Sequence, residues 1–262
     1  MNIYINAIEV VSEGINNWPQ AQAILLGKED YNAGSIDKYK PNSLPANERR
    51  RATNLVRLAF QVCEQIQEKS KLESPASVFA SSGGDYQIID QICRALSKNE
   101  RLISPTQFHN SVHNSAAGYW GIASHCQSAS TSLSAFDYSF SSGLIESTGL
   151  LVAEHKQVLF VCYDSVPPVP LRTKRSINTA FACAFLLSRE PSDDCIAQFN
   201  LGIENSDSLS HCKIKELEAL RMDNPAAKCL PLLEACAQPN KTELYFDLAC
   251  NQKLKLVVEG RA

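Results

Sequence analysis

The sequence predicts an α/β fold whose central strands are buried on both faces. Two apolar runs, QVLFVC at 157–162 and TAFACAFLL at 179–187, are short and continuous, which is typical of strands covered on both sides. Segments with helical spacing of apolar residues alternate with such runs along the chain. Of the 262 residues, 44% are hydrophobic and 20% are charged, with a formal net charge of −3. This composition excludes a disordered chain and argues against a dedicated nucleic-acid binder.

The N-terminal region predicts a strand, a long loop and a helix. Residues 1–11 alternate between apolar and polar side chains, as a first strand does. Residues 15–46 are interrupted by Asn, Gly and Pro, so we expect mostly loop there. A helix is expected to begin near Pro45 and to cover residues 47–68. Its inward positions follow helical spacing: Leu55, Leu58, Ala59, Val62 and Ile66.

The middle of the chain continues the alternation of strands and helices. ASVFAS at 76–81 is a short buried strand that ends in a serine- and glycine-rich turn. Helices are expected at 86–96 and at 105–122, the latter with a proline in its first turn. STSLSA at 130–135 indicates a strand of small residues. A helix over 137–152 follows it.

The last third predicts further strands and helices. Residues 195–203 are a strand candidate, and 214–220 and 226–237 are helix candidates. Residues 244–248 and 253–258 resemble a closing hairpin, although the connection lacks the favoured Asn-Gly pair.

The ten cysteines and the apolar pattern bear on the cellular environment. No two cysteines lie within three residues of each other, so there is no CxxC metal or redox motif. Many occur in apolar runs, where Cys acts as a small hydrophobic residue. The N-terminus lacks the basic start and apolar run of a secretory signal, and no stretch approaches 18 apolar residues. We therefore expect a reduced, cytoplasmic protein with no membrane span.

Four segments, taken in order, resemble the β-ketoacyl synthases, the thiolase-fold condensing enzymes of fatty-acid and polyketide synthesis. They are LPANERRRATNLVRLAFQVCEQI, VFASSGGDYQIIDQI, ISPTQFHNSVHNSAAGYWGI and STSLSAFDYSFSSGLIESTGLLVAEHKQVLFVCYD. The sequence is similar in particular to the short ketosynthase-like subunits of aryl polyene pathways, which resemble chain-length factors. The resemblance implies an α/β, thiolase-like fold with layered helices and mixed sheets. It also implies one ketosynthase-like domain over 1–262, with an N-terminal half at 1–190 and a shortened C-terminal part at 191–262.

In this family the nucleophile is a cysteine where a strand ends and a helix begins, because helix N–H groups lower the pKa of a thiol there. The resemblance places Asp137 in that position. A carboxylate is a poor acyl acceptor from a thioester, so we predict no catalytic residue. Helix capping is the structural alternative for Asp137. The nearest thiol, Cys126, is expected to be a loop or interface residue.

The histidines that assist the reaction in the family are also missing. Only 125 residues follow Asp137, and they contain two histidines, His155 and His211, in contexts unlike those of the family. His109 and His113 are four residues apart and could share a helix face, but a third zinc ligand is lacking and polar helix residues are the favoured interpretation. Residues 81–84 could hold phosphate, although a tight turn is favoured. We predict neither a cofactor nor a metal.

Basic residues indicate a carrier-protein surface. Arg49, Arg50 and Arg51, with Arg57 farther on, could attract an acidic acyl carrier protein, the alternative being a solvated helix face. A second group, Arg172, Lys174 and Arg175, is expected in a solvated loop. Neither group is interleaved with aromatic residues, so nucleic acid is not implied.

The resulting hypothesis is a non-catalytic subunit that forms a heterodimer with a catalytic ketosynthase and shapes its acyl tunnel. The resemblance places the dimer seam at the nucleophile strand and the preceding helix. The interface residues we predict are Ser130, Thr131, Ser132, Leu133, Ser134, Phe108, Val112 and Tyr119. The alternatives are a divergent acyltransferase or malonyl decarboxylase that acts alone, and a free carrier-binding module.

Overall fold

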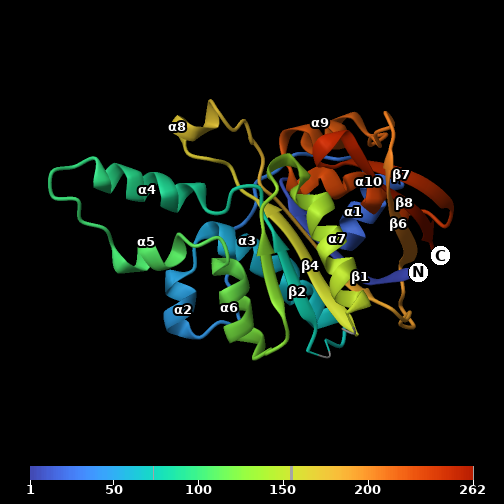
Figure 1. The fold of residues 1–262 in the computed structure, drawn as a ribbon, viewed down its shortest axis with the longest axis horizontal. Coiled ribbons are helices and arrows are strands. Elements are labelled where there is room, and N and C mark those ends of the chain that lie inside the picture. Colours follow the sequence, from blue (N-terminus) through green and yellow to red (C-terminus); the bar gives the residue numbers. More distant parts are fainter. Residues whose placement is uncertain (73, 154–155, 262) are drawn as a thin grey trace.

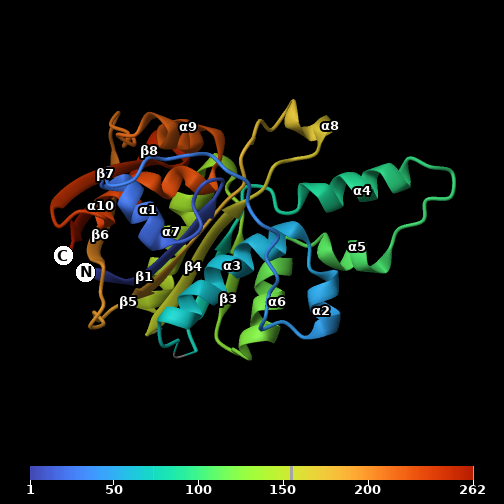
Figure 2. The same cartoon turned by 180° about the vertical axis from the view of Figure 1, so that it is seen from behind.

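One mixed sheet of eight strands forms the centre of the molecule, with helices on both faces (Figures 1 and 2). The computed structural model describes residues 1–72, 74–153 and 156–261. The strands are β1 (Ile3–Ser12), β2 (Ala76–Ala80), β3 (Ser130–Leu133), β4 (Gln157–Asp164), β5 (Phe181–Ser188), β6 (Ala197–Asn205), β7 (Lys241–Asp247) and β8 (Gln252–Gly260). Their order across the sheet is β3-β2-β4-β5-β1-β6-β8-β7. The predicted α/β class is confirmed.

The helices alternate with the strands along most of the chain. They are α1 (Trp18–Leu25), α2 (Ala46–Arg51), α3 (Asn54–Lys69), α4 (Tyr86–Leu96), α5 (Pro105–Asn110), α6 (Ser115–Ser124), α7 (Ser139–Val152), α8 (Val169–Arg172), α9 (Lys215–Asp223) and α10 (Leu230–Cys236). Short 3₁₀ turns occupy Phe136–Tyr138, Ala226–Cys229 and Ala249–Asn251. No helix of the described residues is long and apolar enough to cross a membrane.

The sheet has a parallel part and an antiparallel part. β2 runs parallel to both β3 and β4, whereas β5, β1, β6, β8 and β7 each pair antiparallel to the strand before them in the sheet. The residues after 190 thus extend the sheet beyond β1 with three strands. The register of β1 with β5 shifts between Ile5 and Ala7, and the side chain of Asn6 at this point donates to Ser188 Oγ at 2.9 Å and accepts from the Ser192 amide at 3.0 Å. These bonds fix the connection from β5 to β6.

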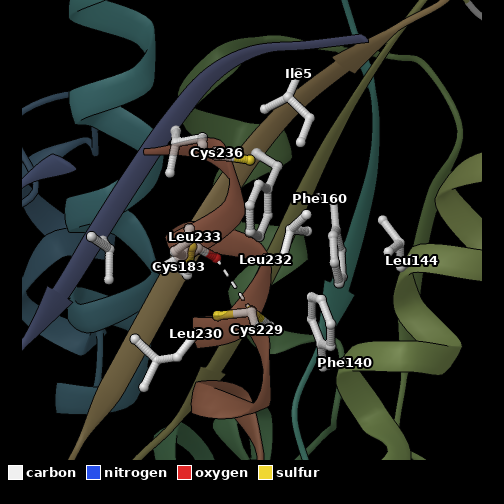
Figure 3. Packing of buried hydrophobic residues seen from close by; sticks show 14 of the residues in the cluster. Ile5, Phe140, Leu144, Phe160, Cys183, Cys229, Leu230, Leu232, Leu233 and Cys236 are labelled. Atoms are coloured by element: carbon white, nitrogen blue, oxygen red, sulfur yellow. Dashed lines mark hydrogen bonds between the residues drawn. The ribbon is translucent and has the colours of Figure 1, made fainter. Parts of the chain in front are cut away.

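The two faces of the sheet carry separate hydrophobic cores. Along β4, Val158 and Phe160 face α7 and α10, and Leu159 and Val161 face α3 and α6. In the first core the rings of Phe140 and Phe160 stack with centroids 5.9 Å apart, close to Cys183, Cys229 and Leu233 (Figure 3). Alternation of this kind is what a strand covered on both faces requires.

Three predicted segments differ from the structure: one loop contains a helix, and two helices are each broken in two. A helix, α1, lies inside the predicted loop, capped by Asn17, whose side chain accepts from the Gln20 amide at 3.0 Å. The predicted helix over 47–68 is broken into α2 and α3, because Thr53 caps a new helix by accepting from the Val56 amide at 3.3 Å. The helix expected over 105–122 is likewise two helices, α5 and α6.

An arm made of α4, α5 and the loop between them projects from the body, as both views show (Figures 1 and 2). It covers residues 86–110. Its apolar side chains are largely exposed: Ile89, Leu96, Leu102 and Phe108. At its base, the buried Asn110 donates to the Arg51 carbonyl at 2.9 Å and accepts from the Tyr119 hydroxyl at 2.9 Å. The arm therefore has an ordered base and an apolar surface without cover.

Candidate functional site

The candidate site lies where the carboxyl ends of β2, β3 and β4 meet. Because these strands are parallel, their ends share one edge of the sheet. Leaving β3, the chain turns at Phe136, whose φ of 53° is in the left-handed region that an aromatic residue seldom adopts. A 3₁₀ turn over Phe136–Tyr138 and then α7 follow. We call this turn from strand to helix, residues 135–139, the elbow. Ser139 closes this elbow, since its hydroxyl donates to the Phe136 carbonyl at 2.7 Å and accepts from the Ala135 amide at 3.0 Å.

Asp137 directly follows the strained residue of the elbow. It makes no side-chain cap, so the capping interpretation is wrong. Instead, one carboxylate oxygen accepts from Arg175 Nη1 at 2.6 Å. The same guanidinium lies over the Phe136 ring, with its Cζ 3.8 Å from the ring centroid. Arg175 reaches the elbow from the segment predicted to be a solvated loop, and its side chain is only 13% exposed. Arg175 therefore holds both Phe136 and Asp137 in place.

No thiol lies at this elbow among the described residues. Cys126 is half-buried in the loop before β3, and its Sγ lies 3.3 Å from the Pro75 carbonyl oxygen. The placement of Asp137 in the nucleophile position stays a prediction. A carboxylate in an ion pair is less nucleophilic toward a thioester than a thiolate.

The histidines do not form an assisting pair. His113 lies between α5 and α6, with Nε2 3.1 Å from the Ser81 carbonyl oxygen, and His109 packs its ring against Tyr119. The shared helix face considered for these two residues is therefore wrong, because the helix ends at Asn110. His211 Nδ1 lies 3.0 Å from Glu218. His155 lies outside the described residues. Nowhere in the described ranges do three metal-binding side chains gather.

A buried carboxylate behind the elbow, Asp164, was missed by the sequence analysis. Its Oδ1 accepts from the Ser81 hydroxyl at 3.0 Å, and from the amide and the hydroxyl of Ser82, both at 2.9 Å. Its Oδ2 has no partner among the described residues. Burial raises the pKa of Asp164 to about 7, against the opposing effects of the serine hydrogen bonds and the charge of Arg175. The donors that could have held a phosphate at 81–84 thus bind a carboxylate of the chain itself. The signal in the sequence is an acidic residue at the end of the apolar run QVLFVCYD.

The predicted interface strand is an edge of the sheet. β3 pairs only with β2 among the described strands, so one side of its backbone is open. Ser130, Thr131 and Ser134 bond within the chain, to Ser77, Glu146 and the Ser82 carbonyl respectively. The buried Ser132 hydroxyl has no partner in the part of the chain that is described. Leu133 is half-buried and completes the strand.

The predicted interface residues on the preceding helices share one groove. Phe108, Val112 and Tyr119 line an apolar hollow of about 500 Å³ together with Pro105 and Ile122. Phe108 is 68% exposed and Val112 50%, whereas the Tyr119 ring is buried at the base. α6 lies beside β3, so the groove and the open strand belong to one side of the molecule.

The arginine group predicted for carrier docking is on α2, and only Arg51 of the three pairs with a carboxylate. Arg49 donates to the Pro41 carbonyl, Arg50 to Asn47, and Arg51 to Glu48. Arg57 does not join them, because it donates to the backbone carbonyls of Tyr39, Arg49 and Ala52 and thereby closes the end of α2.

Solved structures of similar shape are ketosynthase assemblies. A chain of the ketosynthase ApeO in complex with its chain length factor ApeC from Xenorhabdus doucetiae has a TM-score of 0.73 and 22% identity, covering 98% of this chain and 99% of that one. A chain of the ishigamide ketosynthase/chain length factor has a TM-score of 0.74 and 11% identity, with full coverage of both chains. A chain of AntDE:AntF, a type II polyketide acyl-carrier protein in complex with its ketosynthase, has a TM-score of 0.78, 8% identity and 99% coverage of each chain. At these identities the likeness shows the fold, which is the predicted thiolase-like one.

No curated protein matches the sequence. A family model does match, and it is described as beta-ketoacyl synthase, N-terminal domain. The match covers residues 16–244, which include the elbow, the arm, strands β2 to β6 and the start of β7, and leave out β1 and β8. Because this region is most of the sequence, the chain belongs to the β-ketoacyl synthase N-terminal domain family.

Proposed function

We propose that the chain is a non-catalytic subunit, similar to a chain-length factor, that pairs with an active β-ketoacyl-acyl carrier protein synthase and shapes its acyl tunnel. The observation that carries this proposal is the elbow, where a carboxylate paired with Arg175 stands beside the strained residue and no thiol is present among the described residues. A chain with this elbow lacks the nucleophile that condensation needs. Its family membership then points to a role beside a catalytic relative.

The surface around β3 supports the pairing. An open strand edge offers unpaired N–H and C=O groups to a partner strand, and small side chains allow close approach. The apolar groove next to it and the arm supply exposed hydrophobic area of the kind that marks protein interfaces. We propose that Ser130–Ser134, Phe108, Val112 and Tyr119 contact the ketosynthase.

We propose in addition a pathway, a carrier-docking surface, a domain division and a compartment for this chain. The pathway is of the aryl polyene or polyketide type, and Arg49, Arg50 and Arg51 dock the acyl carrier protein. The chain is one ketosynthase-like domain, with an N-terminal part at 1–190 and a shortened C-terminal part at 191–262, whose strands share the sheet through the pairing of β1 with β6. The compartment is the cytoplasm, which suits ten free cysteines.

The test is co-expression with a catalytic β-ketoacyl synthase from the same organism. We expect a heterodimer in size-exclusion chromatography, chain extension of malonyl- and acyl-carrier substrates by the complex, and none by this chain alone. A stable monomer that does not bind a ketosynthase would contradict the proposal. So would acyl transfer by the chain alone that Asp137→Ala or Cys126→Ala abolishes, since that result would make this chain an enzyme in its own right.

A further inference from the structure

Three buried cysteines from three different elements meet in the first hydrophobic core. Cys162 is on β4, Cys183 is on β5 and Cys229 is in the 3₁₀ turn before α10, and each is at most 1% exposed. Their thiols hydrogen-bond with one another, and Figure 3 shows Cys183 and Cys229 together among the apolar side chains of this core. We call these three residues the thiol cluster. Neither the elbow nor the predicted interface uses them.

The sheet holds Cys162 and Cys183 at a separation that suits a disulfide. The two residues are direct partners in the antiparallel pairing of β4 with β5, and both side chains belong to the same core. The Cα atoms of such partners lie about 4.5–5.5 Å apart, which falls inside the roughly 4.4–6.8 Å range of cysteines joined by a disulfide. The backbone therefore needs little movement for the two sulfurs to bond.

The third thiol approaches this pair from the 3₁₀ turn. Cys162 Sγ lies 3.7 Å from the Cys183 carbonyl oxygen and 3.6 Å from the Ala226 carbonyl oxygen, so it is between β5 and the turn that carries Cys229. Burial opposes ionisation of Cys162, but hydrogen bonds from the thiols of Cys183 and Cys229 lower its pKa to about 5. Burial raises the pKa of those two neighbours. Cys162 is thus the member of the cluster that loses its proton most readily, and the thiolate is the reactive form.

We propose that the thiol cluster is a site of reversible oxidation, at which hydrogen peroxide forms a disulfide between Cys162 and Cys183. The thiolate of Cys162 attacks one peroxide oxygen, the O–O bond breaks, and a sulfenic acid forms while hydroxide takes up the thiol proton and leaves as water. The Cys183 thiol then attacks this sulfur, the S–S bond forms and a second water leaves. In sum, two thiols and one peroxide give one disulfide and two waters, so the sulfurs lose the two electrons that the peroxide gains.

The size of the oxidant and the third thiol both favour this reaction. Hydrogen peroxide is scarcely larger than water, so brief local openings of the core admit it while bulkier thiol reagents stay outside. Cys229 donates a hydrogen bond that stabilises the thiolate of Cys162. In a reducing compartment the bridge is transient, because thiol exchange opens it again.

The experiment is oxidation of the folded chain by hydrogen peroxide, followed by proteolysis without reductant and mass spectrometry. The chain carries Cys93→Ser and Cys250→Ser, which remove the two exposed thiols that could link molecules to each other. We expect the peptides that hold Cys162 and Cys183 to be joined, with the loss of two hydrogen atoms, and to separate in dithiothreitol. Since the bridge joins residues 21 positions apart, the oxidised chain should melt about 5 °C or more above the reduced chain.

Three further variants of this chain test the members of the cluster. Cys183→Ala should abolish the bridge. Cys229→Ala should slow its formation about tenfold, as loss of a hydrogen bond to a charged group does. Cys236→Ala is the matched control and should leave the rate unchanged, because Cys236 is buried in the same core but has no thiol hydrogen-bonded to it among the described residues. Circular dichroism verifies that each variant is folded.

The peptide map of the chain with its thiol cluster intact decides the proposal even if a variant fails to fold. Absence of the bridge between Cys162 and Cys183, or its formation only in urea, overturns the site. An oxidised chain that melts no higher than the reduced chain also contradicts it, because the native register would then not fit the bridge. Equal rates with and without Cys229→Ala overturn the role of Cys229. The reaction needs no ketosynthase, so each of these outcomes leaves the proposed function standing.

Discussion

At the scale of single residues, Asp164 ties the ends of two neighbouring strands together. It ends β4 and accepts three hydrogen bonds from Ser81 and Ser82, which follow β2. All three bonds reach one oxygen, and the other oxygen has no partner among the described residues. Burial disfavours the ionised form more than these bonds and the charge of Arg175 favour it, and it therefore raises the pKa of Asp164 to about 7.

This residue should make stability depend on pH. Since the pKa of Asp164 is higher in the folded than in the unfolded chain, its contribution is fully present below about pH 4 and is lost as pH rises through about 7. Asp164→Asn keeps an acceptor for the serines and replaces the unpartnered oxygen with an amide that does not ionise. We expect the free energy of unfolding of wild type to fall relative to that of Asp164→Asn by ~1–3 kcal/mol between pH 4 and 8. Urea denaturation at a series of pH values measures this difference.

The control for this comparison is Asp30→Asn, which changes an exposed carboxylate. Its pH profile should follow that of wild type. If Asp164→Asn and wild type also follow parallel profiles, Asp164 does not titrate between pH 4 and 8, and its assigned role is wrong.

At the scale of elements, α7 is the helix that positions the elbow, and a glycine determines how closely it approaches the sheet. A Cβ on Gly143 would lie 2.5 Å from Phe160 Cε2 and 3.0 Å from Ala80 Cβ. Both contacted residues belong to strands that end at the site, and the Phe160 ring is itself stacked between Phe140 and Phe185. There is no free space into which these neighbours could move.

Gly143→Ala should destabilise the protein by about 1–3 kcal/mol, because a methyl group in a filled core displaces side chains or backbone. Gly149→Ala, on the same helix, is the matched control. A Cβ there meets nothing within 4 Å, so the gain in helix propensity should stabilise the protein by roughly 0.5–1 kcal/mol. Thermal and urea unfolding of both variants measures the contrast. An equal effect of the two substitutions would show that α7 does not depend on this close approach.

Elements that are fixed by interactions close in sequence could be predicted, whereas features that are fixed by distant partners could not. The helix over 86–96 was predicted with both its ends, because its periodicity and its capping Asp85 are local features. The buried strands β4 and β5 were predicted because strands covered on both faces are apolar throughout. The break in the helix expected over 105–122 was not predicted, because Asn110, where α5 ends, is held by Arg51 and Tyr119 from other parts of the chain. The inward turn of Arg175 and the serine clamp on Asp164 also depend on partners that are remote in sequence.

At the scale of the whole molecule, the arm, the apolar groove and the open edge of β3 form one continuous region away from the antiparallel end of the sheet (Figure 1). The opposite edge differs: β7 exchanges hydrogen bonds with Ser210, whose amide donates to the Tyr245 carbonyl at 2.9 Å and whose hydroxyl accepts from the Tyr245 amide at 2.9 Å. That edge is thus partly covered by the chain itself. The open strand edge and the apolar groove thus lie on one side of the molecule.

Phe108→Asp should therefore weaken the proposed heterodimer about tenfold or more, because it places a charge in the apolar groove, while the free chain keeps its melting temperature. Ile203→Asp, which changes a half-exposed apolar residue on β6, is the control and should leave the affinity unchanged. Analytical ultracentrifugation with the ketosynthase measures both affinities. Equal dissociation constants for wild type and Phe108→Asp would show that the groove is not part of the interface.

The distribution of sulfur in the fold provides a built-in reporter of unfolding. Seven cysteines are buried, Cys126 is intermediate, and two, Cys93 and Cys250, are exposed. Burial also raises the pKa of the Cys63, Cys183 and Cys229 thiols, so they stay protonated as well as shielded. A thiol reagent such as DTNB should consequently modify Cys93 and Cys250 at once and the buried thiols only as the chain opens. The rate of the slow phase would measure how often the segments that bury these thiols unfold locally, without any introduced label.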